Sequence, residues 1–247
     1  MAPHNRKRTR RTPDADDEAF DTPDAPAFAP EPAMPRPPSV PLLIAAIGNP
    51  STAYKNTLHS AGHTVLRNVR THLAAPPFRA HLGGEISAPG PERRLTLLGV
   101  REVPLDAASD DGWAFWISGT FMNVSGPAVK RVWDRWRREG GQHGVRSKYG
   151  CLVVVHDELE KPVGEVTVRE GGSSAKGHNG IKSIQAALGS NTPWVRIGVG
   201  IGRPASREAD VVSKHVLRKM TPAEERRIEA ATPEVLQLLR DIADGVR

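Results

Sequence analysis

Polar side chains that could perform acid–base chemistry stand directly after apolar runs of this sequence. The run LLIAAI leads to Asn49 and then His59, CLVVV leads to Asp157, WAFWIS leads to Asn123, and a glycine-rich loop leads to Asn179. A histidine held by a carboxylate acts as a general base, and with no strong nucleophile nearby it would activate water. Amide side chains can donate hydrogen bonds to a developing oxyanion. The set suits direct hydrolysis of an ester.

Each of these features also has a purely structural explanation. Asn-Pro is common in turns, an aspartate after a strand often caps a helix, and glycine-rich loops often only connect elements. The combination favours a site, because the functional loops of open α/β sheets gather at the carboxyl ends of their strands. Taken from the residues alone, both interpretations are open.

Other catalytic and binding motifs are poorly supported. The first apolar run is not followed by G-x-G-x-x-G, and the sequence has no G-x-S-x-G. His59 and His63 have helical i, i+4 spacing, but the glutamate of H-E-x-x-H is missing and no third metal ligand is signalled. The single cysteine, Cys151, lies inside an apolar run and is expected to be a buried thiol. The residues alone therefore give no sign of a metal site or of a nucleotide cofactor.

The hydrophobic pattern alternates between strands and helices after the first 40 residues. Apolar or alternating runs predict strands at residues 42–47, 94–100, 113–118, 151–156, 165–169 and 194–202. Helical spacing predicts helices over residues 58–73, after Ser125, around residues 181–188, and from Thr221, where Glu224 completes a capping box. This order predicts a single α/β domain with a twisted, mixed, mostly parallel sheet and helices on both faces.

Composition separates a tail from the domain. Residues 1–40 hold 9 of the 22 prolines and show no apolar periodicity, which predicts a disordered Pro-rich tail before a domain at residues 41–247. The net charge of +6 favours a polyanionic partner, nucleic acid first. No apolar stretch approaches the roughly 20 residues of a membrane span, so no membrane partner is expected.

Six motifs in one order resemble the bacterial-type peptidyl-tRNA hydrolases. They are GNPSTAY, HSAG, GTFMNVSG, VVVHDELEKPVGEV, KGHNGIKSI and RIGVGIGRP, within residues 42–245. The resemblance implies one α/β domain that hydrolyses the ester between peptide and tRNA in peptidyl-tRNA and so recycles the tRNA. It also implies a monomer that needs no metal or cofactor. The added tail is similar to eukaryotic members, and a cytoplasmic or mitochondrial location is expected.

The resemblance also implies roles for residues. His59 matches the catalytic base, Asp157 its orienting carboxylate, and Asn49 the residue that helps to place water. Asn123 and Asn179 match the amides that hold the peptide and the reacting carbonyl. The full set of expected substrate-binding residues is Tyr54, Asn123, Asn179, Lys176, Arg169 and Arg196.

Three of these substrate-binding residues are basic. Arg169 and Arg196 match a clamp for the tRNA 5′-phosphate, and Lys176 lies where it could assist. The segment after Arg203 is expected to supply a lid and the last helix.

Two motifs depart from the common bacterial form. Bacterial members usually carry Arg-His-Asn-Ala-Gly around the base, whereas this chain has Leu58-His59-Ser60-Ala61-Gly62, and GGSSAKGHNG replaces Gly-His-Gly-Gly-His-Asn-Gly. The alternative function is a non-catalytic RNA-binding relative that acts in RNA splicing. Retention of the His, Asp and Asn set argues against it, since RNA binding alone requires none of them.

Overall fold

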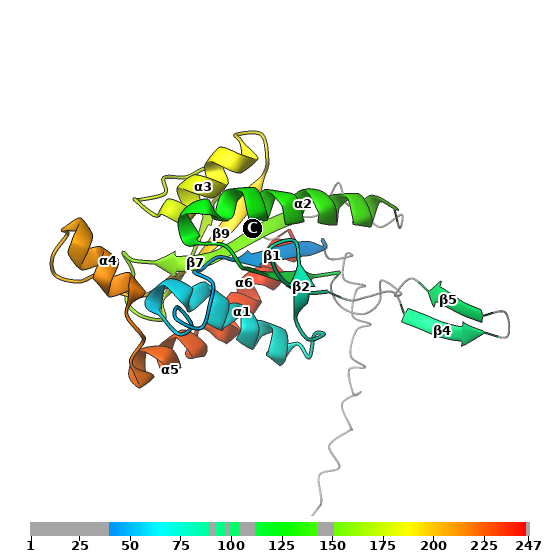
Figure 1. Cartoon of the computed structure of the whole chain (residues 1–247), viewed down its shortest axis with the longest axis horizontal. Helices are drawn as coiled ribbons and strands as arrows, with labels where there is room; N and C mark the ends of the chain where they lie inside the picture. The colour runs from blue at the N-terminus through cyan, green and yellow to red at the C-terminus, as the bar shows by residue number, and fades with distance from the viewer. Residues whose placement is uncertain (1–39, 89–91, 97–98, 104–111, 143–150, 246–247) are drawn as a thin grey trace, which may run out of the picture. The chain divides into compact units, whose positions relative to one another are not determined.

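A computed structural model describes residues 40–88, 92–96, 99–103, 112–142 and 151–245. A seven-stranded sheet forms the centre of this part of the chain (Figure 1). In spatial order its strands are β2 (Arg79–His81), β3 (Gly84–Ser87), β6 (Ala114–Ser118), β1 (Leu42–Ala46), β7 (Cys151–Glu158), β9 (Trp194–Gly200) and β8 (Val166–Glu170).

The four central strands run parallel, and the strands that flank them, β3 and β8, run against them. β1 pairs in parallel with β6 and β7, and β7 pairs in parallel with β9, whereas β3 and β8 pair antiparallel with β6 and β9. The carboxyl ends of β1 and β7 therefore lie side by side in the middle of the sheet. These are the ends from which Asn49 and Asp157 were predicted to project.

One face of the sheet is covered by α2 (Ser125–Gln142) and α3 (Asn179–Leu188). Alternate residues of β1, such as Leu43 and Ala45, face this layer and pack with Val129 and Val132 of α2 and Ile184 of α3. The two helices also bind each other, because the backbone N–H of Gly126 donates to Oγ of Ser183 at 2.9 Å. A 3₁₀ turn, η2 (Met122–Val124), leads into α2 and carries Asn123.

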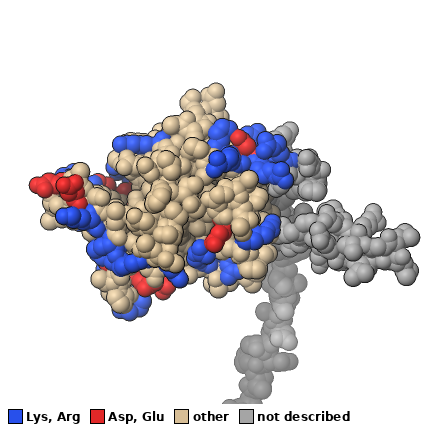
Figure 2. Space-filling model, in the orientation of Figure 1, with Lys and Arg blue, Asp and Glu red and all other residues tan. Residues whose placement is uncertain are grey.

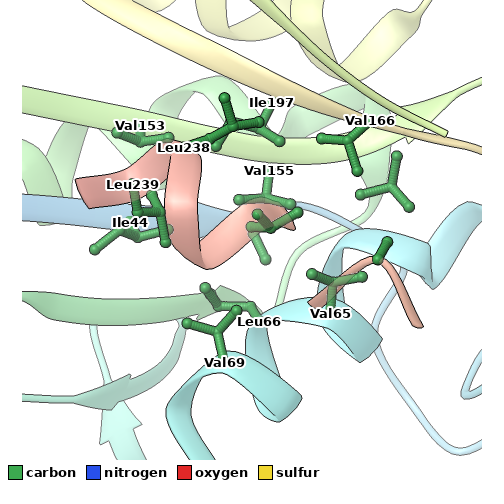
Figure 3. Close-up of a cluster of buried hydrophobic side chains, with 14 of the residues drawn as sticks. Ile44, Val65, Leu66, Val69, Val153, Val155, Val166, Ile197, Leu238 and Leu239 are labelled. Atoms are coloured by element: carbon green, nitrogen blue, oxygen red, sulfur yellow. The ribbon is translucent and has the colours of Figure 1, made fainter. Parts of the chain in front are cut away.

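The other face is covered by α1 (Ala61–His72), α5 (Pro222–Ala230) and α6 (Thr232–Ala243). Figure 3 shows Val65, Leu66 and Val69 of α1 and Leu238 and Leu239 of α6 gathered against strand residues such as Ile44 and Val155. A 3₁₀ turn, η1 (Leu58–Ser60), precedes α1, and α4 (Ala209–Leu217) precedes α5. Apolar burial on both faces holds the central strands, and therefore the loops at their ends, in place.

The structure confirms the predicted fold class and most elements. The capping box at Thr221 and Glu224 is present at the start of α5. The prediction of one strand over residues 94–100 was wrong. β4 (Glu92–Thr96) and β5 (Gly99–Val103) are antiparallel partners in a separate sheet, since a short run with period two can be one strand or parts of two.

The expected tail lies outside the described residues, so the boundary at residue 40 stays a prediction. None of the helices in the described ranges combines the length and the apolar character needed to cross a bilayer.

Candidate active site

A buried carboxylate and a partly exposed imidazole meet at the carboxyl end of β7. Nδ1 of His59 lies 2.9 Å from Oδ2 of Asp157, whose side chain is only 3% exposed. The two residues are 98 positions apart, and Gly62 allows α1 to bring them together. A Cβ at Gly62 would lie 2.7 Å from the backbone carbonyl oxygen of Val155, so only glycine lets the helix start approach β7 this closely.

A second histidine occupies the other carboxylate oxygen. Nε2 of His178 lies 3.0 Å from Oδ1 of Asp157, and His178 is also the N-cap of α3, where its Nδ1 accepts from the backbone N–H of Ile181 at 3.3 Å. Because that N–H can only donate, Nδ1 of His178 is unprotonated and Nε2 carries the proton toward Asp157. The capping bond therefore sets the tautomer of a residue beside the catalytic pair.

The hydrogen bond to Asp157 likewise sets the tautomer of His59. An ionised carboxylate can only accept hydrogen bonds, so Nδ1 of His59 donates to Asp157 and Nε2 presents a lone pair. Within the described part of the chain, Nε2 of His59 makes no hydrogen bond, and the side chain keeps 16% of its surface exposed. This arrangement is that of a general base ready to take a proton from water.

The pKa values of the pair are coupled. Burial acts to lower the pKa of His59, but the charge of Asp157 and its hydrogen bond outweigh burial and hold that pKa above its usual value. Burial alone would raise the pKa of the Asp157 carboxyl, yet His59 and His178 together hold it far below its usual range. His156, whose Nδ1 donates to the backbone carbonyl of Asp157 at 2.7 Å, has its pKa lowered to about 3, chiefly by burial. Asp157 therefore stays ionised, and His156 stays neutral near pH 7.

The three predicted asparagines surround the ends of the same strands. Oδ1 of Asn49 accepts from the backbone N–H of Met122 at 2.9 Å, which leaves its amide N–H₂ group as a donor. Asn123 and Asn179 line one cavity of about 540 Å³, and Asn49 lines another of about 960 Å³. Gly180 permits the close approach of α3 to the turn that carries Asn123, because a Cβ there would lie 2.5 Å from Sδ of Met122.

A metal ion has one candidate position among the described residues. His59, Asp157 and His178 each offer a ligand atom, and these atoms lie within 4.8 Å of one another. In the observed arrangement the same atoms are joined by two hydrogen bonds. Both imidazoles would have to lose the N–H that Asp157 accepts before they could bind a metal through these nitrogens. Hydrolysis without a metal or a cofactor stays a prediction.

The comparisons with known proteins agree with this site. The family model described as peptidyl-tRNA hydrolase matches residues 43–247. The chain belongs to the peptidyl-tRNA hydrolase family. A curated peptidyl-tRNA hydrolase of Haemophilus influenzae is 34% identical over 203 residues, which are 81% of this chain and 90% of the relative. The one of Saccharomyces cerevisiae is 32% identical over 74% of this chain and 86% of its own length.

A solved structure shows the same fold. The crystal structure of peptidyl-tRNA hydrolase from Acinetobacter baumannii matches with a TM-score of 0.59 and 23% identity, over 83% of this chain and 89% of that one. At this identity the likeness concerns the fold alone. The expected peptidyl-tRNA hydrolase architecture is thereby confirmed.

The predicted phosphate clamp of this family member lies on β8 and β9. Arg169 and Arg196 are direct cross-strand partners. Arg196 is only 3% exposed and donates to the backbone carbonyls of Ser173 and Ser174, so it also orders the loop that carries the exposed Lys176. Burial and the neighbouring Arg169 lower the pKa of Arg196. The role of these residues in binding a 5′-phosphate stays a prediction.

The residues that depart from the bacterial motif serve the backbone around His59. Leu58 is fully buried in the core, and Oγ of Ser60 donates to the carbonyl of Tyr54 at 2.9 Å. The ring of Tyr54 meets Phe121 edge-on, with 6.2 Å between ring centroids. Both substitutions therefore support the turn that presents the base. The part of Tyr54 in substrate binding stays a prediction.

His178 is the site residue that the sequence analysis missed. The motif KGHNGIKSI was recognised, and its Lys176 and Asn179 were given roles, but His178 was not. A histidine before a helix is an unusual N-cap, and that position beside a glycine-rich loop was the available signal. Its partner, Asp157, lies 21 residues away, so the contact itself could not be seen in the sequence.

Proposed function

We propose that this chain hydrolyses the ester bond between the peptide and the tRNA of peptidyl-tRNA, with His59 as the general base. The observation that carries the proposal is the 2.9 Å contact between His59 and a buried, ionised Asp157, which leaves Nε2 of His59 available to water. Family membership supplies the substrate class, because the relatives are named for it. The geometry of the site and the membership of the family therefore support the proposal independently.

The mechanism begins with proton transfer from water to Nε2 of His59. The oxygen of that water forms a bond to the ester carbonyl carbon, and the carbonyl oxygen becomes an oxyanion. The amide N–H₂ group of Asn49 and those of Asn123 and Asn179 are the nearby side-chain donors that could hold the oxyanion and the peptide. Their roles remain part of the proposal.

Collapse of the tetrahedral intermediate breaks the bond between the carbonyl carbon and the ribose oxygen. The imidazolium of His59 returns its proton to that oxygen, so the products are a peptide with a free carboxyl group and a tRNA with a free ribose hydroxyl. Asp157 stabilises the imidazolium between the two proton transfers through their shared hydrogen bond.

The function is tested by incubating the purified full chain with an N-acetylated aminoacyl-tRNA and measuring release of the acyl group. We expect turnover that exceeds spontaneous hydrolysis and that is lost in His59→Ala. Binding of tRNA without any hydrolysis would refute the enzymatic function and favour the non-catalytic RNA-binding alternative.

The proposal extends to the oligomeric state. The residues proposed for catalysis all belong to one chain, and a monomer that holds the whole site is part of the proposal. Light scattering after size-exclusion chromatography tests this state. The choice between a cytoplasmic and a mitochondrial location stays a prediction.

A further inference from the structure

The exposed side of α2 carries a dense group of cations. We call this group the basic face of α2: Lys130, Arg131, Arg135, Arg137 and Arg138, all of which are exposed. Figure 2 shows Lys and Arg side chains gathered over the C-terminal half of this helix. The one acidic residue among them, Asp134, pairs with Lys130 at 2.6 Å. The face therefore carries a strong net positive charge.

Packing of α2 does not account for this charge. The helix is held by its opposite side, where Val129, Val132 and Trp133 are buried against the sheet. Trp133 also stacks on Trp136, with 5.5 Å between ring centroids, and the guanidinium of Arg137 lies 5.6 Å from the Trp133 ring centroid. A helix that is anchored by its buried side thus presents several guanidinium groups on its exposed side.

The basic face begins close to the candidate active site. α2 starts at Ser125, two residues after Asn123, and at 1.5 Å per residue Arg131 and Arg138 stand about 9 Å and about 20 Å along the axis from that start. A nucleic acid whose end reaches Asn123 and whose backbone runs along α2 would meet these arginines within a few nucleotides of that end.

The basic face also lies on the same side of the sheet as the predicted phosphate clamp. On β9, Trp194 packs with α2 and α3, and Arg196 is two residues further, so it faces the same layer. Arg169 is its cross-strand partner and shares that face. The exposed Lys182 of α3 lines the same cavity as Asn123, Asn179 and Pro127 of α2. Exposed cations therefore lie on both helices of this layer, and the predicted clamp lies on the same side of the sheet.

We propose that the basic face of α2 binds the sugar–phosphate backbone of the substrate tRNA. The inference rests on the proposed function for its choice of tRNA. Guanidinium groups match phosphate oxygens in charge and in bidentate geometry, and several of them on one rigid helix suit a regularly repeating anion. The contact is independent of base sequence and adds affinity away from the reacting ester.

The test variant is Arg131→Gln combined with Arg138→Gln. It leaves in place the ion pair of Lys130 with Asp134 and the contact of Arg137 with Trp133. The matched control is Arg226→Gln combined with Arg240→Gln. These arginines are exposed on α5 and α6, which cover the other face of the sheet, so the control loses the same charge from a different layer.

Binding of deacylated tRNA is measured by fluorescence anisotropy over a series of salt concentrations. We expect the α2 variant to bind at least about threefold more weakly at moderate salt, and its slope of log K against log salt to be shallower by about 1 per arginine removed. The control should retain nearly the wild-type slope. Equal slopes for the two variants, or an unchanged affinity of the α2 variant, would overturn the proposal.

Kinetics separate this inference from the proposed function. With peptidyl-tRNA as the substrate, the α2 variant should show a raised KM and an unchanged kcat, because Arg131 and Arg138 lie away from the catalytic pair. Hydrolysis that is absent in the wild-type chain while the α2 variant still binds tRNA more weakly would reject the enzymatic function and keep the docking surface. Normal hydrolysis with an unchanged KM in the variant would reject the docking surface and keep the function.

Discussion

At the scale of single residues, the proposed chemistry depends most on Asp157. It accepts from His59 on one carboxylate oxygen and from His178 on the other, and its own backbone carbonyl accepts from His156. The two donors to the carboxylate, His59 and His178, stabilise its ionised form, although the side chain is buried. A permanent negative charge in this place raises the pKa of His59 and sets which of its nitrogens faces water.

A pH prediction follows from the raised pKa of His59. Only the neutral imidazole can accept a proton, so kcat/KM should fall as the pH drops through a pKa above the usual 6.5. Asp157→Asn removes the cause of the elevation and leaves burial, which lowers the pKa of His59. The acid limb of the pH–rate profile should therefore move to lower pH while the maximal rate falls. An acid limb that stays in place in the variant would show that Asp157 does not tune the base.

At the scale of elements, the site depends on how closely two helices approach the strand ends. Gly62 lets α1 touch the backbone of β7, and Gly180 lets α3 approach Met122. His178 adds a direct link, because one imidazole both caps α3 and binds Asp157. The catalytic geometry is thus a result of helix-to-strand packing and of helix capping.

Gly62→Ala tests the packing of α1 on β7. The added methyl group would lie 2.7 Å from the carbonyl oxygen of Val155, so α1 must shift and carry His59 away from Asp157. We expect a loss of about 1–3 kcal/mol in unfolding free energy and a lower kcat. Gly172→Ala is the control, since a Cβ at Gly172 meets nothing within 4 Å. Equal stability and activity in the two variants would contradict this account of Gly62.

Two substitutions of His178 separate its two roles. Asparagine is a good N-cap, so His178→Asn should keep the thermal stability near that of the wild type, while His178→Ala should lose about 1 kcal/mol. Both variants remove the imidazole donor from Asp157, and both should lower turnover. Activity that follows thermal stability across the two variants, with His178→Asn fully active, would reduce His178 to a helix cap.

At the scale of the whole molecule, the domain is expected to work without the tail. The backbone N–H of Val40 donates to the carbonyl of Ala243 at 2.7 Å, which fastens the start of the described chain to the end of α6. Deletion of residues 1–39 keeps this bond and removes a segment whose composition cannot bury much surface. Thermal melting and peptidyl-tRNA hydrolysis should both change little. A large loss of either would mean that the tail contributes to the folded domain.

The strands at the centre of the sheet were predicted from the sequence more accurately than the strands toward its edge. β1 and β7 are continuous apolar runs, as strands covered on both faces must be, and each was recognised before its neighbours were known. The short strand β2 at the edge has no buried residue, and its neighbour β3 buries only Ile86 and Ser87; neither has such a pattern, and neither was predicted. These strands form because they pair with neighbouring strands. Pairing depends on segments that are distant in the sequence, so a local pattern does not indicate it.

The site residues divide in the same way into those with a local signal in the sequence and those without one. Asn49, His59, Asn123 and Asp157 follow apolar runs and Asn179 follows a glycine-rich loop, which are local signals, and the family resemblance gave each residue a specific role. His178 and the buried state of Arg196 depend on contacts across the sheet. The close approach at Gly62 depends on the same kind of contact, so no local pattern could indicate it.

The central claim is that His59 and Asp157 act as one unit on water. The measurement is a double-mutant cycle of turnover with His59→Ala, Asp157→Asn and the double variant, with tRNA binding and melting checked for each. We predict a loss of at least about 10²-fold for His59→Ala, and little further loss in the double variant, because the carboxylate acts through the imidazole. Full activity in His59→Ala, or losses that multiply in the double variant, would contradict the account.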